Sequence, residues 1–502
     1  MKKLLPLSTF LMLLMLAGCH DDADDVGGSV ARITSFAVDG HLFSLEGAAF
    51  TCFIPDDIDK TTLVADFEAT GQVFVNGVPQ LSGVTANDFT PALLYTVVND
   101  DGSRQEYTVR LVTFTRLPRI HIDTDNGLPI TSKDVYVTAR VAIDPNHDVP
   151  SSPATLTGRV RGRGNSTWEM PKKSYKIKFD QSYPILGERP HREWVLLANY
   201  ADKTLLRNAL AFQLSRHMGM SFTPCAHYVE LYVNNVHMGN YLLTDQVEVA
   251  PYRVDVDELD VSDDGAMEIT GGWLLEVNQA VLRKLDEPFF ETEYYPIVVK
   301  SPEAPTAAQM SYIRQYFWDF EYTLYTDGFK DPVNGFRKFM DDTTMVKWFI
   351  INELFKNVDA QRYGSIYFYK ARSQKLKMGP VWDFDLSSGN AFHNPDCMLP
   401  TGWYVKENKW IVRMMEDEAF RALVKATWQQ HRNHIGALLT DIDGLVERLE
   451  LSLAINEKLW PKYHDPADYV VPNINTYDGQ VQWLSDFLSQ RMAWMDAQLA
   501  GW

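Results

Sequence analysis

The stretch NVDAQRYGSIYFYKARSQKLKMGPVWDFDLSSGN, residues 357–390, carries three aspartates on two loops that flank a predicted hairpin. SIYFYK and KLKMGPVW predict two strands, and ARSQ between them predicts a tight turn. Because a hairpin returns its two ends to one place, Asp359 before it should face Asp383 and Asp385 after it. The later two aspartates are separated by one residue, so in an extended chain both side chains point to the same side. The stretch therefore predicts a cluster of three carboxylates.

Carboxylates this close repel one another unless a cation lies between them. Mg²⁺ prefers hard oxygen ligands and often binds through one or two carboxylates together with substrate phosphates. In phosphoryl transfer, one aspartate holds the metal and another receives the proton of the acceptor hydroxyl. The simpler interpretation is that Asp383 and Asp385 only cap the loop or helix start at LSSGN. The second acidic loop, at hairpin distance, favours a site for Mg²⁺ or Mn²⁺.

A site that handles phosphate also needs positive charge, and the segment VRGRGNSTWEMPKKSYKIKFD, residues 160–180, supplies it. Its glycines allow a turn to approach a ligand closely. The segment matches neither a Walker loop nor the G-x-G-x-x-G fingerprint, so by itself it is a weak signal. The basic residues of the segment are Arg161, Arg163, Lys172, Lys173, Lys176 and Lys178.

Residues 28–116 predict an all-β domain. LVADF and VFVNGV alternate between apolar and polar residues, and LYTVVNDDGSRQEYTVRLV predicts a hairpin with Asn, Asp and Gly at its turn. Short strands at regular spacing, without a helical pattern, indicate a small β-sandwich. It is similar to the immunoglobulin-like modules that follow the lipid anchor in many Bacteroidetes surface proteins, and we expect it to act as a spacer.

Residues 117–502 predict a second domain that is rich in strands at first and rich in helices from about residue 340. KTLLRNALAFQLSRHMG, residues 203–219, has a leucine or methionine at every fourth position from Leu206 to Met218, followed by Gly219, and so predicts a helix with one buried face. This order of elements predicts an α+β fold rather than a regular βαβ alternation.

In the predicted strand SYKIKF, Tyr175, Ile177 and Phe179 should face the core. Lys176 and Lys178 should then face the other way, toward either a cleft or solvent. The helix pattern in DDTTMVKWFIINELFKN, residues 341–357, begins with two acids and places its aromatic residues on one side.

The N-terminal residues predict export and a lipid anchor. Two lysines precede the apolar run LLPLSTFLMLLM, which is too short to span a bilayer, and the run leads to LAGC. The motif is similar to a bacterial lipoprotein signal, with residues 1–18 removed and Cys19 acylated; the alternative is a plain secretory signal. Residues 19–27 form an acidic tether, and HDDADD resembles the signal that sends Bacteroidetes lipoproteins to the cell surface. We therefore expect an outer-membrane lipoprotein that faces the cell surface and contacts the membrane through its anchor alone.

The net charge and the cysteines argue against two other kinds of site, a nucleic-acid interface and a zinc or redox centre. The formal net charge of −19 argues against a nucleic-acid partner, which would need a basic face. Cys52, Cys225 and Cys397 show no Cys-x-x-Cys spacing, so the sequence makes no case for a zinc or redox site. We expect buried free thiols for most of them.

Six ordered blocks resemble the CotH family, the kinase-like proteins named after a spore coat protein. The resemblance covers residues 117–500. The blocks are RGRGNSTWEMPKKSYKIKF, WVLLANYADKTLLRNALAFQL, GNYLLTDQVEV, GGWLLEVN, FKNVDAQRYGSIYFYK and GPVWDFDLSSGN.

The resemblance implies a two-lobed, atypical protein-kinase-like fold that binds ATP and Mg²⁺ and phosphorylates protein hydroxyls. Asp359 takes the place of the catalytic aspartate, and Asp383, with Asp385 beside it, takes the place of the metal-binding aspartate. The implied nucleotide-binding residues are Lys173 as the phosphate lysine, its rivals Lys176 and Lys300, and also Arg163 and Glu276.

The chain departs from protein kinases at one position. Gly364 stands five residues after Asp359, where kinases have a metal-binding asparagine, and Ser365 follows it. Serine is a poorer Mg²⁺ ligand, so the resemblance does not extend to a second metal.

Three function classes stay open at this stage. The first is a phosphotransferase that uses ATP and Mg²⁺ on an unknown protein. The second is a non-catalytic surface lipoprotein that keeps the fold and binds an unknown protein or surface ligand. The third is a glycosyltransferase, since Asp-x-Asp also binds metal–nucleotide complexes, although the chain shows no clear βαβ nucleotide domain. An inverting glycosidase fits less well because the paired aspartates are too close together.

Overall fold

The computed structural model describes residues 30–38, 40–54, 58–113, 115–146, 153–285, 287–391, 393–461 and 474–502. The chain divides into two compact units, residues 1–114 and 115–502. The predicted signal peptide, the acidic tether and the lipidation site Cys19 lie outside the described residues. Among the helices that are described, none is long and apolar enough to cross a membrane.

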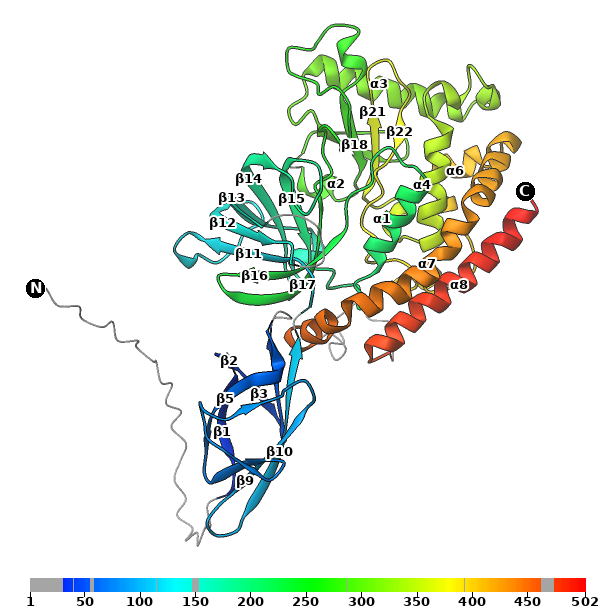
Figure 1. The fold of residues 1–502 in the computed structure, drawn as a ribbon. Helices are drawn as coiled ribbons and strands as arrows, with labels where there is room; N and C mark the ends of the chain where they lie inside the picture. Colours follow the sequence, from blue (N-terminus) through cyan, green and yellow to red (C-terminus); the bar gives the residue numbers. More distant parts are fainter. Residues whose placement is uncertain are drawn as a thin grey trace, which may run out of the picture. The chain divides into compact units, whose positions relative to one another are not determined.

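The first unit is built from two β-sheets around one apolar core (Figure 1). Phe36 and Tyr95 meet edge to face in this core, with their ring centroids 4.9 Å apart. The prediction of β-structure for this part of the chain is therefore confirmed. One sheet has the order β2-β1-β5-β8 and the other β3-β4-β10-β9-β6-β7. The strands are β1 Ile33–Val38, β2 His41–Leu42, β3 Ser44–Glu46, β4 Ala49–Ile54, β5 Leu63–Ala69, β6 Gln72–Val75, β7 Val78–Gln80, β8 Ala86–Asn87, β9 Leu93–Val98 and β10 Arg104–Thr113.

The second unit begins with a closed barrel in the order β11-β12-β13-β14-β15-β17-β16. Most neighbours are antiparallel, and the parallel pair of β11 with β16 closes the ring. Tyr175, Ile177 and Phe179 are buried in the barrel core, as the alternation of SYKIKF predicted. The strands are β11 Arg119–Thr124, β12 Val137–Asp144, β13 Ala154–Arg163, β14 Ser174–Tyr183, β15 His191–Leu197, β16 His227–Val233 and β17 Val236–Asp245.

A five-stranded antiparallel sheet follows in the order β19-β20-β18-β21-β22. Its last two strands form the hairpin predicted from SIYFYK and KLKMGPVW, although β22 is much shorter than expected. The strands are β18 Trp273–Val277, β19 Phe289–Glu291, β20 Pro296–Ser301, β21 Ile366–Lys370 and β22 Lys377–Met378.

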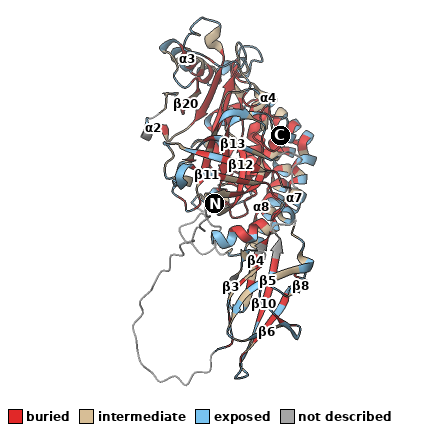
Figure 2. Ribbon diagram, turned by 60° about the vertical axis from the view of Figure 1, so that its left-hand side comes forward, coloured by how far each residue is buried: buried red, intermediate tan, exposed pale blue. Residues whose placement is uncertain are grey.

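The helices share an apolar core with this sheet. α7 packs against α1, α4, α8 and the barrel strand β17, and Figure 1 shows α7 and α8 running side by side. In Figure 2 both long helices carry buried and exposed stripes, which is typical of helices that cover a core. The helices are α1 Arg207–His217, α2 Val281–Lys284, α3 Ala307–Leu324, α4 Asp342–Phe355, α5 Pro395–Met398, α6 Lys409–Met414, α7 Glu418–Leu459 and α8 Tyr477–Ala500.

Two helices follow their sequence patterns closely. The apolar face predicted from Leu206 to Met218 is buried along α1, and Gly219 follows in the left-handed conformation that ends the helix. α4 is capped at its start by Asp341, whose carboxylate accepts the backbone N–H of Thr344. The α+β class is therefore confirmed.

Candidate functional site

The two predicted acidic loops meet. α4 ends at Phe355, and Asp359 opens the 3₁₀ turn Asp359–Gln361 before the chain enters the β21–β22 hairpin. The backbone N–H of Val358 donates to the carbonyl of Leu386 at 3.3 Å, which ties the Asp359 loop to the segment that follows Asp385. The hairpin thus brings Asp359 to the Asp383 loop, as expected from the sequence.

Ser365 connects two carboxylates of this site. Its hydroxyl donates to Asp383 Oδ2 at 3.2 Å, and its backbone N–H donates to Glu276 Oε1 at 3.1 Å. Glu276 is buried on β18, next to the strand β21 that follows Ser365. Gly364 occupies the position at which kinases have a metal-binding asparagine, and it is the next residue, Ser365, that contributes an oxygen to the cluster.

The backbone of Asp383 is in an unusual conformation. Its φ of 65° lies in the left-handed region, which residues other than glycine adopt only at an energetic cost. The loop is fixed on both sides, since the Phe384 N–H donates to Asn208 Oδ1 at 2.7 Å and Asn390 Nδ2 donates to the Asp385 carbonyl at 2.7 Å. Strained residues held by their surroundings are frequent at functional sites.

Four acidic side chains, Asp359, Asp383, Asp385 and Glu276, interact in this cluster, and burial together with neighbouring acids disfavours the charged form of three of them. Burial, with the charges of Asp383 and Glu276, raises the pKa of Asp359 to about 7. Burial also raises the pKa of Glu276 to about 7, against the opposing charge of Lys300. For Asp385, burial and the charges of Asp383, Asp359 and Asp202 raise the pKa well above its usual range. Such a group of acids attracts a cation.

Two of the predicted cations reach the cluster. Burial lowers the pKa of the Arg163 guanidinium, and the charges of Asp383 and Asp385 oppose that shift, so Arg163 feels the charge of the cluster. The guanidinium lies 5.7 Å from the centroid of the Trp382 ring. Lys300 on β20 lies 4.0 Å from the Glu276 carboxylate on β18 and also pairs with Glu287.

The other two predicted cations have different partners. Lys173 donates to the carbonyl of Trp168, and its ammonium lies 5.3 Å from the centroid of that ring. Lys176 forms an ion pair with Glu193 on the neighbouring strand β15. Lys173 and Lys176 therefore bond to groups of the barrel and its loops, whereas Arg163 and Lys300 interact with the carboxylates of the cluster.

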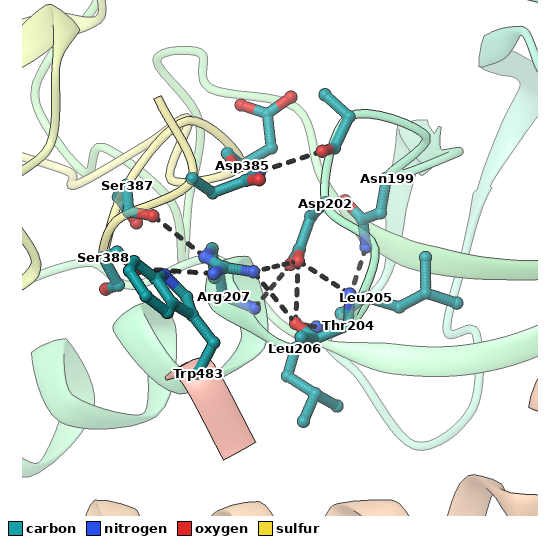
Figure 3. Close-up of polar contacts among 12 residues, drawn as sticks. Asn199, Asp202, Thr204, Leu205, Leu206, Arg207, Asp385, Ser387, Ser388 and Trp483 are labelled. Carbon is teal, nitrogen blue, oxygen red and sulfur yellow. Dashed lines mark hydrogen bonds and ion pairs between the residues drawn. The ribbon is translucent and has the colours of Figure 1, made fainter. Parts of the chain in front are cut away.

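Sequence reasoning missed a polar network beneath the Asp385 loop (Figure 3). Asp202 and Arg207 form a fully buried ion pair at the start of α1. Arg207 Nε donates to the Ser387 carbonyl at 2.9 Å and Nη2 to the Ser388 carbonyl at 3.3 Å. The available signal was a charged and an amide residue, Arg207 and Asn208, inside an otherwise apolar helix start. The network fixes the backbone of the loop that presents Asp385.

The donors that meet in this cluster fit a hard divalent cation. Carboxylate and hydroxyl oxygens are the ligands that Mg²⁺ prefers, and Ser365 Oγ lies 3.2 Å from Asp383 Oδ2. Among the described residues, however, no three acids of this cluster bring their ligand atoms within 4.8 Å of one another, so one or two carboxylates would hold a cation together with water or substrate phosphates. Partly exposed Asp383 and Asp385 can reach a ligand from solvent.

Comparison with known proteins gives one informative match. The family model described as "CotH kinase protein" matches residues 160–495. No curated protein matches. One solved structure, of a provisionally assigned glycoside hydrolase from Bacteroides thetaiotaomicron, is 18% identical with a TM-score of 0.16. That alignment covers 31% of this chain and 54% of the other, and with so low a TM-score it says nothing about function.

Proposed function

The chain belongs to the CotH kinase protein family, and we propose that it transfers the γ-phosphoryl group of ATP to a serine or threonine hydroxyl of a protein, with Mg²⁺ or Mn²⁺. The observation that carries this proposal is the meeting of the Asp359 loop with the Asp383 loop, tied by the Val358–Leu386 hydrogen bond. Phosphoryl transfer needs one carboxylate for the cation and a second for the acceptor hydroxyl, and Asp383 and Asp359 are our candidates for these two roles.

In this proposal Asp383 and Asp385 hold the cation, which when bound would offset the negative charge of the ATP phosphates. Ser365 orients Asp383 through its hydroxyl. Asp359 positions the acceptor hydroxyl and takes its proton. In the cation-free protein, burial and the neighbouring acids bring the pKa of Asp359 to about 7, which suits a proton acceptor near neutral pH.

Arg163 and Lys300 are our choice for the cations that face the phosphates. Arg163 interacts electrostatically with Asp383 and Asp385, and a guanidinium can donate two hydrogen bonds to one phosphate. Lys300 on β20 pairs with buried Glu276 on the neighbouring strand β18, and this ion pair holds the ammonium group near the cluster. The contacts of Lys173 with Trp168 make it a weaker candidate than the sequence suggested.

Non-catalytic binding at the cell surface is the second candidate, and one observation favours it. Trp318 and Tyr322 on α3 are 57% and 62% exposed, and their rings stack with centroids 5.3 Å apart. Exposed aromatic side chains are enriched where proteins bind partners. Under either candidate we retain acylation of Cys19 and a place on the outer membrane as proposals, supported by the LAGC motif.

The test is transfer of radiolabelled γ-phosphate to a mixture of candidate acceptor proteins, with binding of Mg²⁺–ATP measured in parallel. Asp383→Asn keeps the size of the side chain and removes the charge that holds the cation, so metal-dependent ATP binding should weaken. Asp359→Asn should bind Mg²⁺–ATP normally while transfer falls by ~10²–10⁴-fold, the usual contribution of a positioned base.

Asp443→Asn, at an exposed position of α7, is the control and should change neither quantity. If the wild-type protein binds Mg²⁺–ATP but transfers no phosphate, the second candidate is favoured. If both cluster variants bind Mg²⁺–ATP as the wild type does, the aspartates are structural and the kinase assignment is wrong.

A further inference from the structure

A second polar site lies on the barrel and shares no residue with the aspartate cluster. It is a cavity of about 250 Å³ lined by the β14–β15 turn, the end of α1, the segment before β16 and the loop after β17. Three of its lining side chains, Glu188, Cys225 and His227, can each offer a ligand atom, and these three atoms lie within 4.8 Å of one another. The proposed phosphotransfer chemistry uses none of them.

The fold brings the three groups together from separate segments. Cys225 and His227 are two positions apart where the chain enters β16, so both side chains can point to the same side. Glu188 comes from the turn between β14 and β15, and its carboxylate Oε1 lies 2.7 Å from His227 Nε2 although the residues are 39 positions apart in the sequence. A thiol, an imidazole and a carboxylate are the three kinds of side chain that bind zinc.

We propose that Glu188, Cys225 and His227 bind Zn²⁺ or a similar thiophilic divalent cation, with a fourth ligand position open to the cavity. Three protein ligands with one open position distinguish an accessible zinc site from a closed structural one. Water or an anionic group that enters the cavity would complete the coordination.

The distances suit this proposal after a small adjustment. Zinc lies ~2.0–2.3 Å from such ligands, so in a tetrahedral site the ligand atoms are separated by roughly 3.3–3.8 Å. The present separations, from 2.7 Å for the Glu188–His227 pair to at most 4.8 Å within the set, lie on both sides of that range. The Glu188 side chain is 36% exposed and can move by the required amount without disturbing the core.

A supporting layer fixes the cysteine. The Cys225 backbone N–H donates to Asp245 Oδ2 at 2.8 Å, and Arg253 Nε donates to Asp245 Oδ1 at 3.0 Å. Groups of this kind orient metal ligands and are important for affinity.

Titration of the purified full chain with Co²⁺ tests the site, since cobalt reports its own ligands through its absorption spectrum. The protein is first stripped of metal with a chelator, and millimolar Mg²⁺ is present to saturate the aspartate cluster. We expect one equivalent of Co²⁺ to bind with a thiolate-to-cobalt charge-transfer band, and one equivalent of Zn²⁺ to remove that band.

Matched variants assign the ligands. Cys225→Ser should lose the thiolate band, whereas Cys397→Ser, which changes another buried free cysteine, should keep it. Glu188→Gln and His227→Ala should each weaken Co²⁺ binding by at least the ~10-fold that follows loss of even a supporting group. Glu188 lies on a partly exposed turn, so its variant tests the proposal even if Cys225→Ser does not fold. Absence of a thiolate band in the wild type, or unchanged affinity in Glu188→Gln, would overturn the three-ligand site.

Discussion

Replacing Arg491 by methionine should destabilise the second unit by several kcal/mol. Arg491 on α8 and Glu353 on α4 form an ion pair in which both side chains are 0% exposed. Arg491 Nη1 also donates to the carbonyls of Gly402 at 2.6 Å and Pro400 at 2.9 Å. Glu353 in turn accepts the backbone N–H of Tyr404 at 2.9 Å. One ion pair therefore joins α4, α8 and the segment before α6.

The magnitude follows from the charge that the substitution leaves behind. Methionine fills much of the space of Arg491 but leaves the buried Glu353 carboxylate without its cation, which costs about 3–5 kcal/mol. Since a whole domain is stable by only about 5–15 kcal/mol, the effect is a large share of the total. The cost should depend on pH. Burial already raises the pKa of Glu353 against the opposing charge of Arg491, and loss of that charge removes the opposition. A carboxyl whose pKa is raised on folding favours the folded state while protonated, so the variant should be less destabilised at pH 5 than at pH 8.

Urea unfolding followed by tryptophan fluorescence measures this effect, because every tryptophan of the chain lies in the second unit. Arg432→Met is the matched control: Arg432 pairs with Asp496 between α7 and α8, but their side chains are 37% and 42% exposed. An exposed pair is worth about 0–1 kcal/mol. Equal losses in Arg491→Met and Arg432→Met, or no pH dependence of the difference, would refute the reasoning.

Three further predictions concern the barrel, the phosphate cations and the smaller unit. Burial acts to raise the pKa of Glu193, but the hydrogen bonds and charges of Lys176 and Lys178 outweigh it and lower the pKa to about 2. The ionised carboxylate therefore stabilises the fold above pH ~4.5, and this stabilisation is lost as the pH falls toward 2. Glu193→Gln should cost about 3 kcal/mol of unfolding free energy at neutral pH and make the loss of stability in acid less steep. Equal acid limbs would contradict this. Arg163→Ala should weaken Mg²⁺–ATP binding, measured by calorimetry, by ~10-fold or more, as expected for loss of a charged hydrogen bond. Lys173→Ala should weaken it by clearly less. The reverse order would make Lys173 the phosphate-binding residue. The fragment Thr115–Trp502 should bind Mg²⁺–ATP as tightly as the full chain, and loss of binding in a folded fragment would place part of the site in residues before 115.

Local patterns predicted what depends on local geometry. Alternation assigned the core face of SYKIKF correctly because side chains in a strand alternate whatever the strand pairs with. The spacing of three aspartates around a hairpin predicted that Asp359 would face the Asp383 loop because a hairpin needs no distant partner. Buried thiols were predicted for most of the cysteines, and Cys225 and Cys397 are buried free thiols.

Long-range contacts account for what the sequence did not reveal. Closure of the barrel depends on a parallel pairing of β11 with β16, whose residues lie far apart in the chain. Lys173 was chosen as the phosphate lysine from its motif, but its direction is set by the carbonyl and ring of Trp168, a contact that spacing does not specify. The proposed zinc ligands escaped notice because Glu188 lies far in sequence from Cys225 and His227, and no Cys-x-x-Cys motif marks them.

The central claim, that Asp383 and Asp385 hold a divalent cation carrying ATP phosphates, is tested most directly by a thermal-shift titration with ATP in the presence and absence of Mg²⁺. At 100 times its dissociation constant a ligand stabilises the folded state by about 2.7 kcal/mol. The account predicts a clear rise in the melting temperature of the second unit with ATP and Mg²⁺ together, a small one with ATP alone, and loss of the difference in Asp383→Asn. No rise at millimolar ATP with Mg²⁺, or the same rise in Asp383→Asn as in the wild type, would contradict it.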